Sequence, residues 1–377
     1  MRIYAVGGAI RDQLLGLKIH DIDYVVVGAT VKEMLTNGFR PVGKDFPVFL
    51  HPETQAEYAL ARTERKTASG HQGFLFYADP SVTLEEDLSR RDLTINAMAQ
   101  AVDEAGNLMG EIIDPYGGKA DLAAKQFRHV SQAFAEDPLR LIRVARFAAR
   151  FSDFKIHPTT LLVMRAIVAS GELQALSRER IWHELSRAWT SIAPLRFVEV
   201  LEEVDAANLI FPEAFLHVWN NQKQQDQLAF EIKNCKPDLE SRCAVLLKAI
   251  NPSSISQWSE HYKMPHEVRD FVLITADLFQ TLSSDQITAD IVLNFFNRAD
   301  LWRKPERLKK IISLLSGLGY ELGIWNTALN VVDSVNASAL AEQVKQANQT
   351  NSNLGPLIHQ AVEAARLKAI HQAMVGN

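Results

Sequence analysis

The strongest constraint on the fold is a change in hydrophobic periodicity near Pro138. Upstream, short apolar runs such as 3–6, 21–27 and 57–62 alternate with turn residues and short helical segments, a pattern typical of a mixed sheet with helices. Downstream, almost every segment has the spacing of an amphipathic helix, and prolines separate the segments. The sequence therefore predicts an α+β fold, with a small N-terminal head on a mixed sheet and an all-helical remainder.

The composition is that of a soluble globular protein with two to four domains. The 377 residues are 47% hydrophobic and 23% charged, and no apolar run approaches the length of a bilayer. The first residues do not resemble a signal peptide, because Arg11 and Asp12 interrupt the apolar stretch. Cys235 and Cys243 have no metal-ligand spacing, which predicts buried thiols in a reducing cytoplasm. The net charge of −5 means that RNA binding would need local basic patches.

A pair of carboxylates, Asp21 and Asp23, is the first feature that suggests chemistry. Residues two apart in a strand project from the same face, so these side chains repel each other unless a cation lies between them. An oxygen-rich site with open positions suits Mg²⁺, which also binds phosphate oxygens. The alternative is a pair of solvent-exposed aspartates on an edge strand.

A Gly7-Gly8 turn joins the first predicted strand to a helix at 9–15. Glycines let backbone N–H groups approach an anion, and the positive end of the helix dipole adds to this effect. Arg11, in the first helical turn, could contact a phosphate. A plain structural turn is the alternative, but this turn followed by Asp21 and Asp23 describes a triphosphate and its metal at one end of a sheet.

Four ordered motifs in about the first 150 residues resemble a known family. They are 6–16 with 21–23, 90–98, 113–118, and 136–140 with 143–147. Together they resemble the class II polymerase-β-like nucleotidyltransferases, and within these the bacterial CCA-adding enzymes and their poly(A) polymerase relatives. The resemblance implies a catalytic head at 1–137, a helical neck at 138–210 that reads the nucleobase and binds RNA, and a tRNA-binding helical body at 211–377.

The resemblance also implies roles for individual residues. Asp21 and Asp23 would be catalytic and hold Mg²⁺, while Asp92 and Arg91 would select the ribonucleotide and Asn96 would brace their turn. The implied nucleotide-binding residues are Gly8, Arg11, Arg91, Asp92, Asp137, Arg140, Arg143 and Arg146.

Asp137 and Arg140 are three residues apart, so they would share a face if both were helical. A carboxylate accepts hydrogen bonds and a guanidinium donates them. Cytosine and adenine offer an amine donor beside a ring-nitrogen acceptor, whereas uracil and guanine present the reverse order, so the pair could discriminate between the two sets. The resemblance implies that it replaces a nucleic-acid template. An ordinary helical ion pair is the alternative.

A row of arginines lies on one face of the predicted helix that begins near Pro138. At about 100° per residue, Arg140, Arg143, Arg146 and Arg150 fall within an arc of roughly 120°. Such a cationic stripe suits a triphosphate and an RNA backbone. A solvated helix face is the alternative.

Three further expectations concern the head and two polar stretches. Glu57 is a candidate third carboxylate and Glu64 a weaker one, because each lies in or beside a predicted strand. The segment 63–73 is a predicted hairpin loop that could shift as the site changes from CTP to ATP. The polar stretches 220–227 and 346–353 are predicted loops or frayed ends.

The helical body departs from relatives that carry a metal-dependent phosphohydrolase domain of the His-Asp type. That chemistry needs an adjacent His-Asp pair and further histidines. Lys248-Ala249 stands where the pair would be expected. We therefore predict a degenerate, hydrolase-like helical domain without metal ligands.

The most specific expectation is template-independent addition and repair of the tRNA 3′-terminal CCA with CTP, ATP and Mg²⁺, releasing pyrophosphate. The chain would work in the cytoplasm, away from membranes, as a monomer or weak homodimer. The alternatives are a poly(A) polymerase, which the lack of a basic tail disfavours, an enzyme adding only CC or only A, an inactive tRNA-binding scaffold, and a small-molecule nucleotidyltransferase.

Overall fold

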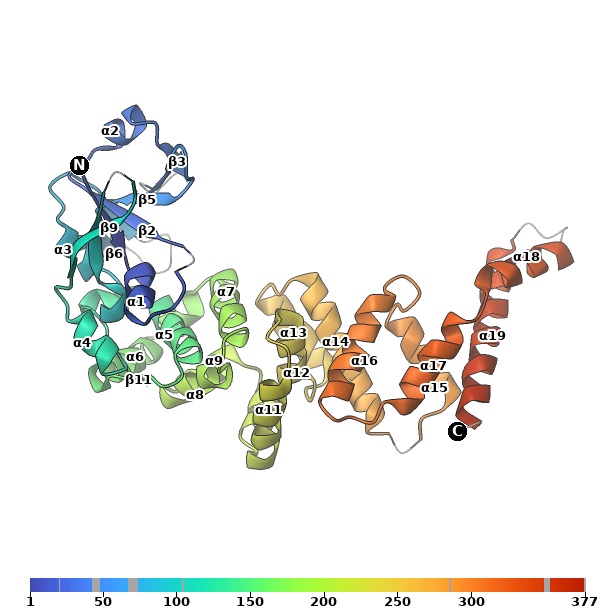
Figure 1. Ribbon diagram of the computed structural model, residues 1–377. Coiled ribbons are helices and arrows are strands. Elements are labelled where there is room, and N and C mark those ends of the chain that lie inside the picture. The colour runs from blue at the N-terminus through green and yellow to red at the C-terminus, as the bar shows by residue number, and fades with distance from the viewer. Residues whose placement is uncertain are drawn as a thin grey trace. The chain divides into compact units, whose positions relative to one another are not determined.

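The computed structural model describes residues 1–19, 21–42, 48–66, 74–103, 105–284, 286–348 and 353–375. The chain divides into two compact units, Met1–Ile210 and Phe211–Asn377. Strands occur in the first unit, and the second is built from helices α10 to α19 (Figure 1). In the described part of the chain, no helix is long and apolar enough to cross a membrane.

A seven-stranded mixed sheet forms the centre of the first unit, with the order β3-β4-β5-β2-β1-β8-β9. β2 and β5 are parallel, and the other neighbouring pairs are antiparallel. The mixed sheet expected from the sequence is therefore confirmed. Its strands are β1 (Arg2–Val6), β2 (Asp23–Val27), β3 (Arg40–Val42), β4 (Val48–Leu50), β5 (Glu57–Leu60), β8 (Ala99–Val102) and β9 (Leu108–Ile113).

Both faces of this sheet are covered, because alternate residues of its central strands enter two different cores. Ala5 and Val26 pack with Ile10 and Met34 on one side. Tyr4, Val6, Val25 and Val27 pack on the other side with Leu88. Burial on both faces explains why β2 reads as a continuous apolar run rather than an alternating one.

The expected strand at 21–27 is two residues too long. β2 begins at Asp23, which pairs with Val6, the last residue of β1. Asp21 and Ile22 precede the ladder because β1 ends there at the Gly7 turn and offers them no partner. The two aspartates therefore do not sit on one strand as predicted.

The expected loop at 63–73 is partly strand. β6 (Thr63–Lys66) and β7 (Phe74–Tyr77) form an antiparallel hairpin, whose register pairs Lys66 with Phe74. The remainder of the expected loop, 67–73, lies outside the described residues.

The helices that follow the sheet complete the first unit. α5 (Leu139–Arg150) contacts both α7 (Arg178–Trp189) and α8 (Leu195–Glu203). One short parallel pair, β10 (Gln126–Phe127) with β11 (Lys155–Ile156), interrupts the otherwise helical segment and differs from the all-helical expectation. The other helices are α1 (Gly8–Leu14), α2 (Val31–Thr36), α3 (Leu84–Ser89), α4 (Gly118–Ala123), α6 (Pro158–Ala169) and α9 (Ala207–Ile210).

The second unit is helical where it is described, as expected. Its helices are α10 (Glu213–Trp219), α11 (Gln222–Asn234), α12 (Leu239–Leu247), α13 (Pro252–His261), α14 (His266–Leu282), α15 (Ala289–Arg298), α16 (Pro305–Gly317), α17 (Gly323–Asp333), α18 (Ala337–Ala347) and α19 (Gly355–Val375). The expected loop at 220–227 is wrong, because Asn221 caps α11 through a bond from Gln224 N to its side chain. The polar residues form the exposed face of that helix.

Lys248, at the end of α12, is buried in the core of the second unit. Its ammonium pairs with the carboxylate of the wholly buried Glu231 on α11. The Tyr320 hydroxyl and the Gln227 amide donate to the other Glu231 oxygen, and the Phe279 ring lies 4.9 Å from the ammonium. The buried carboxylate is thus compensated by protein groups alone.

Candidate active site

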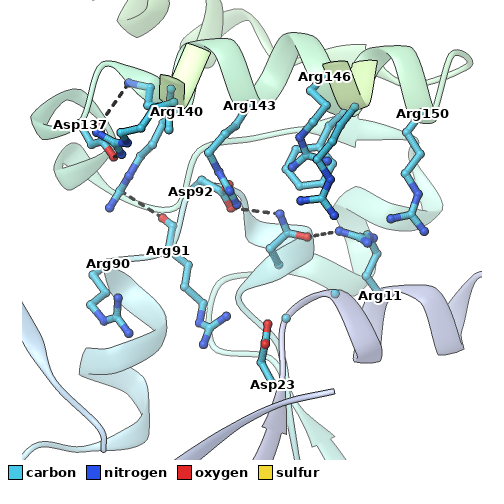
Figure 2. Close-up of a pocket in the computed structure, with 17 residues that line it drawn as sticks. Arg11, Asp23, Arg90, Arg91, Asp92, Asp137, Arg140, Arg143, Arg146 and Arg150 are labelled. Atoms are coloured by element: carbon cyan, nitrogen blue, oxygen red, sulfur yellow. Dashed lines mark hydrogen bonds and ion pairs between the residues drawn. The ribbon is translucent and has the colours of Figure 1, made fainter. Parts of the chain in front are cut away.

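A cavity of about 490 Å³ opens in the first unit between the end of the sheet and helix α5 (Figure 2). Three of its lining residues are acidic: Asp23, Asp92 and Asp137. Its excess of positive charge suits a polyanion such as a nucleoside triphosphate. Nine lining residues are arginines: Arg11, Arg90, Arg91, Arg140, Arg143, Arg146, Arg150, Arg180 and Arg187.

The Arg91 guanidinium lies directly against the backbone of the turn at Gly7. Gly7 has φ +70°, and a Cβ built there would lie 2.8 Å from Arg91 Nη1. A side chain at Gly7 would therefore both strain the backbone and displace the guanidinium. Burial lowers the pKa of Arg91, but Asp87 and Asp23 oppose this effect. The Arg91 charge is thus held beside the backbone turn that precedes α1.

A chain of hydrogen bonds crosses the cavity from α1 to α5 (Figure 2). Arg11 donates to Asn96 Oδ1, and Asn96 Nδ2 donates to Asp92 Oδ1 at 3.0 Å. Arg143 Nε donates to Asp92 Oδ2 at 2.7 Å. Asp12 anchors the outer end by accepting from Arg11 Nε and Arg150 Nη2. Three elements that are far apart in the sequence are therefore held in one arrangement.

Asp92 is a buried carboxylate that stays ionised. Burial alone would raise its pKa, but Arg143, Asn96 and the nearby Arg140 together hold that pKa well below its ordinary value. The same contact with Asp92 raises the pKa of Arg143. Both shifts favour the charged forms, so Asp92 and Arg143 form an ion pair at neutral pH.

Side chains of helix α7 hydrogen-bond to Asp137 and to one arginine of the row on α5. Arg180 Nη2 donates to Asp137 Oδ2 at 2.8 Å, while Asp137 Oδ1 accepts from Leu139 N at 3.1 Å. One helical turn later, the buried carboxylate of Glu184 accepts from Arg146 Nε. The arginine face of α5 is therefore not a solvated face, because Arg140 and Arg146 are both buried.

Asp137 and Arg140 lie together, but not by the predicted route. Asp137 has extended backbone angles, and α5 begins only at Leu139. Its main-chain carbonyl accepts from Arg140 N at 3.0 Å, which ties the two residues through the turn that starts the helix. The expectation that both residues lie on one helix face is wrong, because a residue that precedes a proline, as Asp137 precedes Pro138, is disfavoured from helical backbone angles.

Asp23 lies between two cavities. It lines the arginine-rich cavity and also a second one, of about 590 Å³, which Asp21, Glu57 and Gln55 line as well. Glu57 is on β5 beside β2, as expected. However, within the described ranges no group of three or more His, Cys, Asp or Glu side chains could hold a metal. Glu57 therefore does not complete a three-carboxylate set, and the Glu64 side chain lies outside the description.

The donor set at Asp21 and Asp23 fits Mg²⁺. Both carboxylates are exposed and face one cavity. Mg²⁺ is usually held by one or two carboxylates, with water and substrate phosphates completing its octahedron. The neighbouring cavity offers the cationic surface on which such phosphates would lie.

The structure brings almost all of the predicted site residues into the arginine-rich cavity. Gly8, Asp23, Arg11, Arg91, Asp92, Asp137, Arg140, Arg143 and Arg146 line it, and Asp21 lines the adjacent cavity. Sequence reasoning missed Arg180, Glu184 and Arg187, because their spacing on one helix face does not distinguish them from charges on a solvated face. It also missed Asp87 and the partner role of Asp12.

Comparisons with known proteins show the family to which the chain belongs. A family model described as the poly A polymerase head domain matches residues 3–128, and one described as a probable RNA and SrmB-binding site of polymerase A matches residues 153–216. The multifunctional CCA protein of Cupriavidus necator is 42% identical over 407 aligned residues, which cover 98% of each chain. This chain belongs to the family of multifunctional CCA proteins. A second member of that family, from Cupriavidus metallidurans, is 65% identical over 56% of this chain and 51% of its own length.

Solved structures share the fold of the family. The Bacillus stearothermophilus CCA-adding enzyme in complex with CTP has a TM-score of 0.68 at 22% identity, over 98% of this chain and 89% of its own. A CCA-adding enzyme with ATP has a TM-score of 0.63 at 22% identity, over 98% and 86%. These likenesses confirm the expected polymerase-β-like head followed by a helical body.

Proposed function

We propose that this chain builds and repairs the 3′-terminal CCA of tRNA, using CTP and ATP and releasing pyrophosphate, without a nucleic-acid template. The observation that carries the proposal is the position of Asp23 at the junction of two cavities, one lined by arginines and one bordered by Asp21 and Glu57. A nucleoside triphosphate fits the first cavity, and an RNA 3′ end fits the second. The names of its family relatives support this reading.

Asp21 and Asp23 would hold Mg²⁺. When bound there, Mg²⁺ supplies Lewis-acid chemistry that activates the RNA 3′-hydroxyl and neutralises the departing pyrophosphate. The residues of this chain then have to place the reacting groups in line, which is the main task of a protein in phosphoryl and nucleotidyl transfer. The exposed carboxylates are placed to hold the metal, and the chain of hydrogen bonds from Arg11 to Arg143 is placed to orient the nucleotide.

The triphosphate would be bound by the glycine turn and the cationic side chains around it. These are Gly8, Arg11, Arg91, Arg143 and Arg146. Each guanidinium is already oriented by a protein carboxylate or amide, so little side-chain freedom is lost when a phosphate binds.

Asp137 and Arg140 would read the base. A carboxylate that accepts from an exocyclic amine, beside a guanidinium that donates to a ring nitrogen, matches cytosine and adenine. Uracil and guanine would place an acceptor where the site expects a donor and a donor where it expects an acceptor, which is a costly mismatch in a polar site. Asp137 is fixed for this task by Leu139 N and Arg180.

The second unit would bind the body of the tRNA without hydrolysing phosphate esters. Lys248-Ala249 stands where the resemblance leads one to expect a His-Asp pair, and the buried Lys248 ammonium pairs there with Glu231. The test is to measure Ni²⁺ binding and Mg²⁺-dependent phosphatase activity of the full chain. Stoichiometric Ni²⁺ retained by the Asp21→Asn/Asp23→Asn variant, or phosphatase activity in it, would contradict the proposal.

The decisive experiment offers tRNA lacking CCA, lacking CA and lacking A, with each nucleotide in turn. The proposal predicts two C additions and then one A, and no use of UTP or GTP. Addition of A without C would favour a poly(A) polymerase or an A-adding enzyme, and addition that stops after CC would favour a CC-adding enzyme. No incorporation with any substrate would favour a tRNA-binding scaffold.

We further propose that the chain works in the cytoplasm as a monomer or weak homodimer. The buried, unpaired Cys235 and Cys243 fit a reducing compartment. Sedimentation velocity at micromolar concentration would test the assembly state, and a stable tetramer would contradict it.

A further inference from the structure

Every acceptor position of the Asp92 carboxylate is already used. Asp92 Oδ1 accepts from Leu93 N at 2.8 Å and from Asn96 Nδ2 at 3.0 Å. Asp92 Oδ2 accepts from Arg143 Nε and Arg143 Nη2, both at 2.7 Å. A carboxylate has about four lone-pair sites. A ribose hydroxyl therefore cannot hydrogen-bond to Asp92 unless one of these donors leaves.

Only one of the donors is free to leave. Leu93 N belongs to the backbone of the turn, and Asn96 is held on its other side by Arg11. Both Leu93 and Asn96 are buried. The Arg143 side chain, in contrast, is 36% exposed and lines the cavity. Asn96 also lines the cavity but is only 6% exposed, so Arg143 is the partner of Asp92 that a ligand reaches most readily.

From this arrangement, and resting on the proposed function, we propose that the incoming triphosphate draws Arg143 away from Asp92 and so frees Asp92 to accept the ribose 2′-hydroxyl. Arg143 is part of a row in which its neighbours on α5 also face the cavity. A triphosphate carries more charge than one carboxylate and can compete for the guanidinium. Arg140, which also interacts electrostatically with Asp92, remains to compensate the buried charge.

The exchange makes sugar recognition conditional on phosphate recognition. Before the triphosphate binds, ribose and deoxyribose meet the same saturated carboxylate. After it binds, only ribose offers Asp92 a replacement donor. Binding of the triphosphate and binding of the ribose 2′-hydroxyl are therefore coupled through the Arg143 side chain, and each strengthens the other.

A static Arg143 would behave differently. The guanidinium has five N–H donors, and two of them are used on Asp92. If the other three bound phosphate while the pair stayed closed, Asp92 would remain saturated. The preference for ribose would then be the same with or without the triphosphate.

The test compares four equilibrium dissociation constants for the full chain, with Mg²⁺ and without RNA, for ATP, 2′-dATP, AMP and 2′-dAMP. Loss of one charge-assisted hydrogen bond predicts a preference for ATP over 2′-dATP of about tenfold. The preference for AMP over 2′-dAMP is expected to be smaller than about twofold, since one phosphate displaces Arg143 poorly. If the preference for ribose over deoxyribose is the same for ATP with 2′-dATP as for AMP with 2′-dAMP, whether large or absent, the proposed release of Asp92 by the triphosphate is wrong. Failure of ATP to bind at all would instead count against the proposed function.

Two variants sharpen the test. Arg143→Gln frees Asp92 permanently, so the preference for AMP over 2′-dAMP is expected to rise toward the value for the triphosphates. Arg146→Gln is the matched control, because Arg146 is on the same helix and lines the same cavity but pairs with Glu184. Arg146→Gln is expected to weaken ATP binding. The preference for ribose over deoxyribose should still be larger for the triphosphates than for the monophosphates. A change of the monophosphate preference in Arg146→Gln, or none in a folded Arg143→Gln, contradicts the proposal.

Discussion

Arg180 donates from Nη2 to Asp137 Oδ2 at 2.8 Å, although the two residues are 43 positions apart in the sequence. With Leu139 N on the other oxygen, this bond fixes the plane of the carboxylate that we assign to base reading. Arg180 thus acts through Asp137 and is a positioning residue. Its effect is expected on the choice of base.

Replacing Arg180 by Met should reduce the discrimination between CTP and UTP by about tenfold, because a freed carboxylate can rotate and no longer presents a fixed acceptor. The measurement is kcat/KM for each nucleotide with tRNA lacking CCA. Arg187→Met is the matched control, since Arg187 is on the same helix and lines the same cavity. Equal discrimination in the wild type and Arg180→Met would contradict the assigned role.

Replacing Gly7 by Ala should weaken ATP binding more than tenfold, because the new Cβ would lie 2.8 Å from Arg91 Nη1. Backbone strain alone would cost about 1–3 kcal/mol of stability, because φ +70° with ψ −121° is a sparsely populated conformation for any residue with a Cβ. Gly16→Ala separates the two effects, since Gly16 also has a positive φ, +67°, but has no neighbour within 4 Å of the added Cβ. Both variants should lose stability, and only Gly7→Ala should lose nucleotide affinity. Similar losses of affinity would argue against the packing of Arg91 on the turn.

Replacing Glu184 by Gln should lower the free energy of unfolding by about 3 kcal/mol, because it leaves the buried charge of Arg146 uncompensated. Glu199→Gln, at the more exposed Arg196–Glu199 pair, should lower it by about 0.5 kcal/mol. Urea denaturation of the two full-length variants gives both values. Equal losses of unfolding free energy in the two variants would show that the Glu184–Arg146 pair stabilises the fold no more than an exposed ion pair does.

The two cysteines should resist thiol reagents at pH 8. Burial raises the pKa of Cys235 to about 11 and raises that of the wholly buried Cys243 well above its ordinary value. The reactive thiolate is therefore scarce, and it is shielded as well. Reaction with a chromogenic disulfide should be slow in the folded protein and should reach two thiols in guanidinium chloride. Rapid reaction of the folded chain would show that one thiol is accessible.

The sequence was sufficient for the parts of the site that depend on local motifs. Gly8, Arg11 and the arginine row on α5 could be predicted because each has a local reason, such as a turn, a helix start or a helical period, whereas Arg91 and Asp92 were predicted from the family resemblance. The mixed sheet was predictable from short apolar runs for the same reason.

The rest depends on tertiary contacts that leave no local trace. Arg180 and Glu184 are read from the sequence as exposed charges on a helix, but packing of α7 on α5 brings Arg180 to the cavity and Glu184 to Arg146. Asp21 was expected in a strand, but β1 ends too early to pair with it. The polar start of α11 was expected to be a loop, because its composition hides the cap at Asn221.

The Asp21→Asn/Asp23→Asn variant removes both carboxylates that we propose to hold Mg²⁺ for nucleotide addition at an RNA end. The rate of CTP and ATP addition to tRNA lacking CCA is measured for this variant, with nucleotide affinity as the check on folding. We expect the rate to fall at least about a thousandfold, while a folded variant still binds ATP through its arginines. Addition at the wild-type rate would show that the two aspartates are not needed for the reaction.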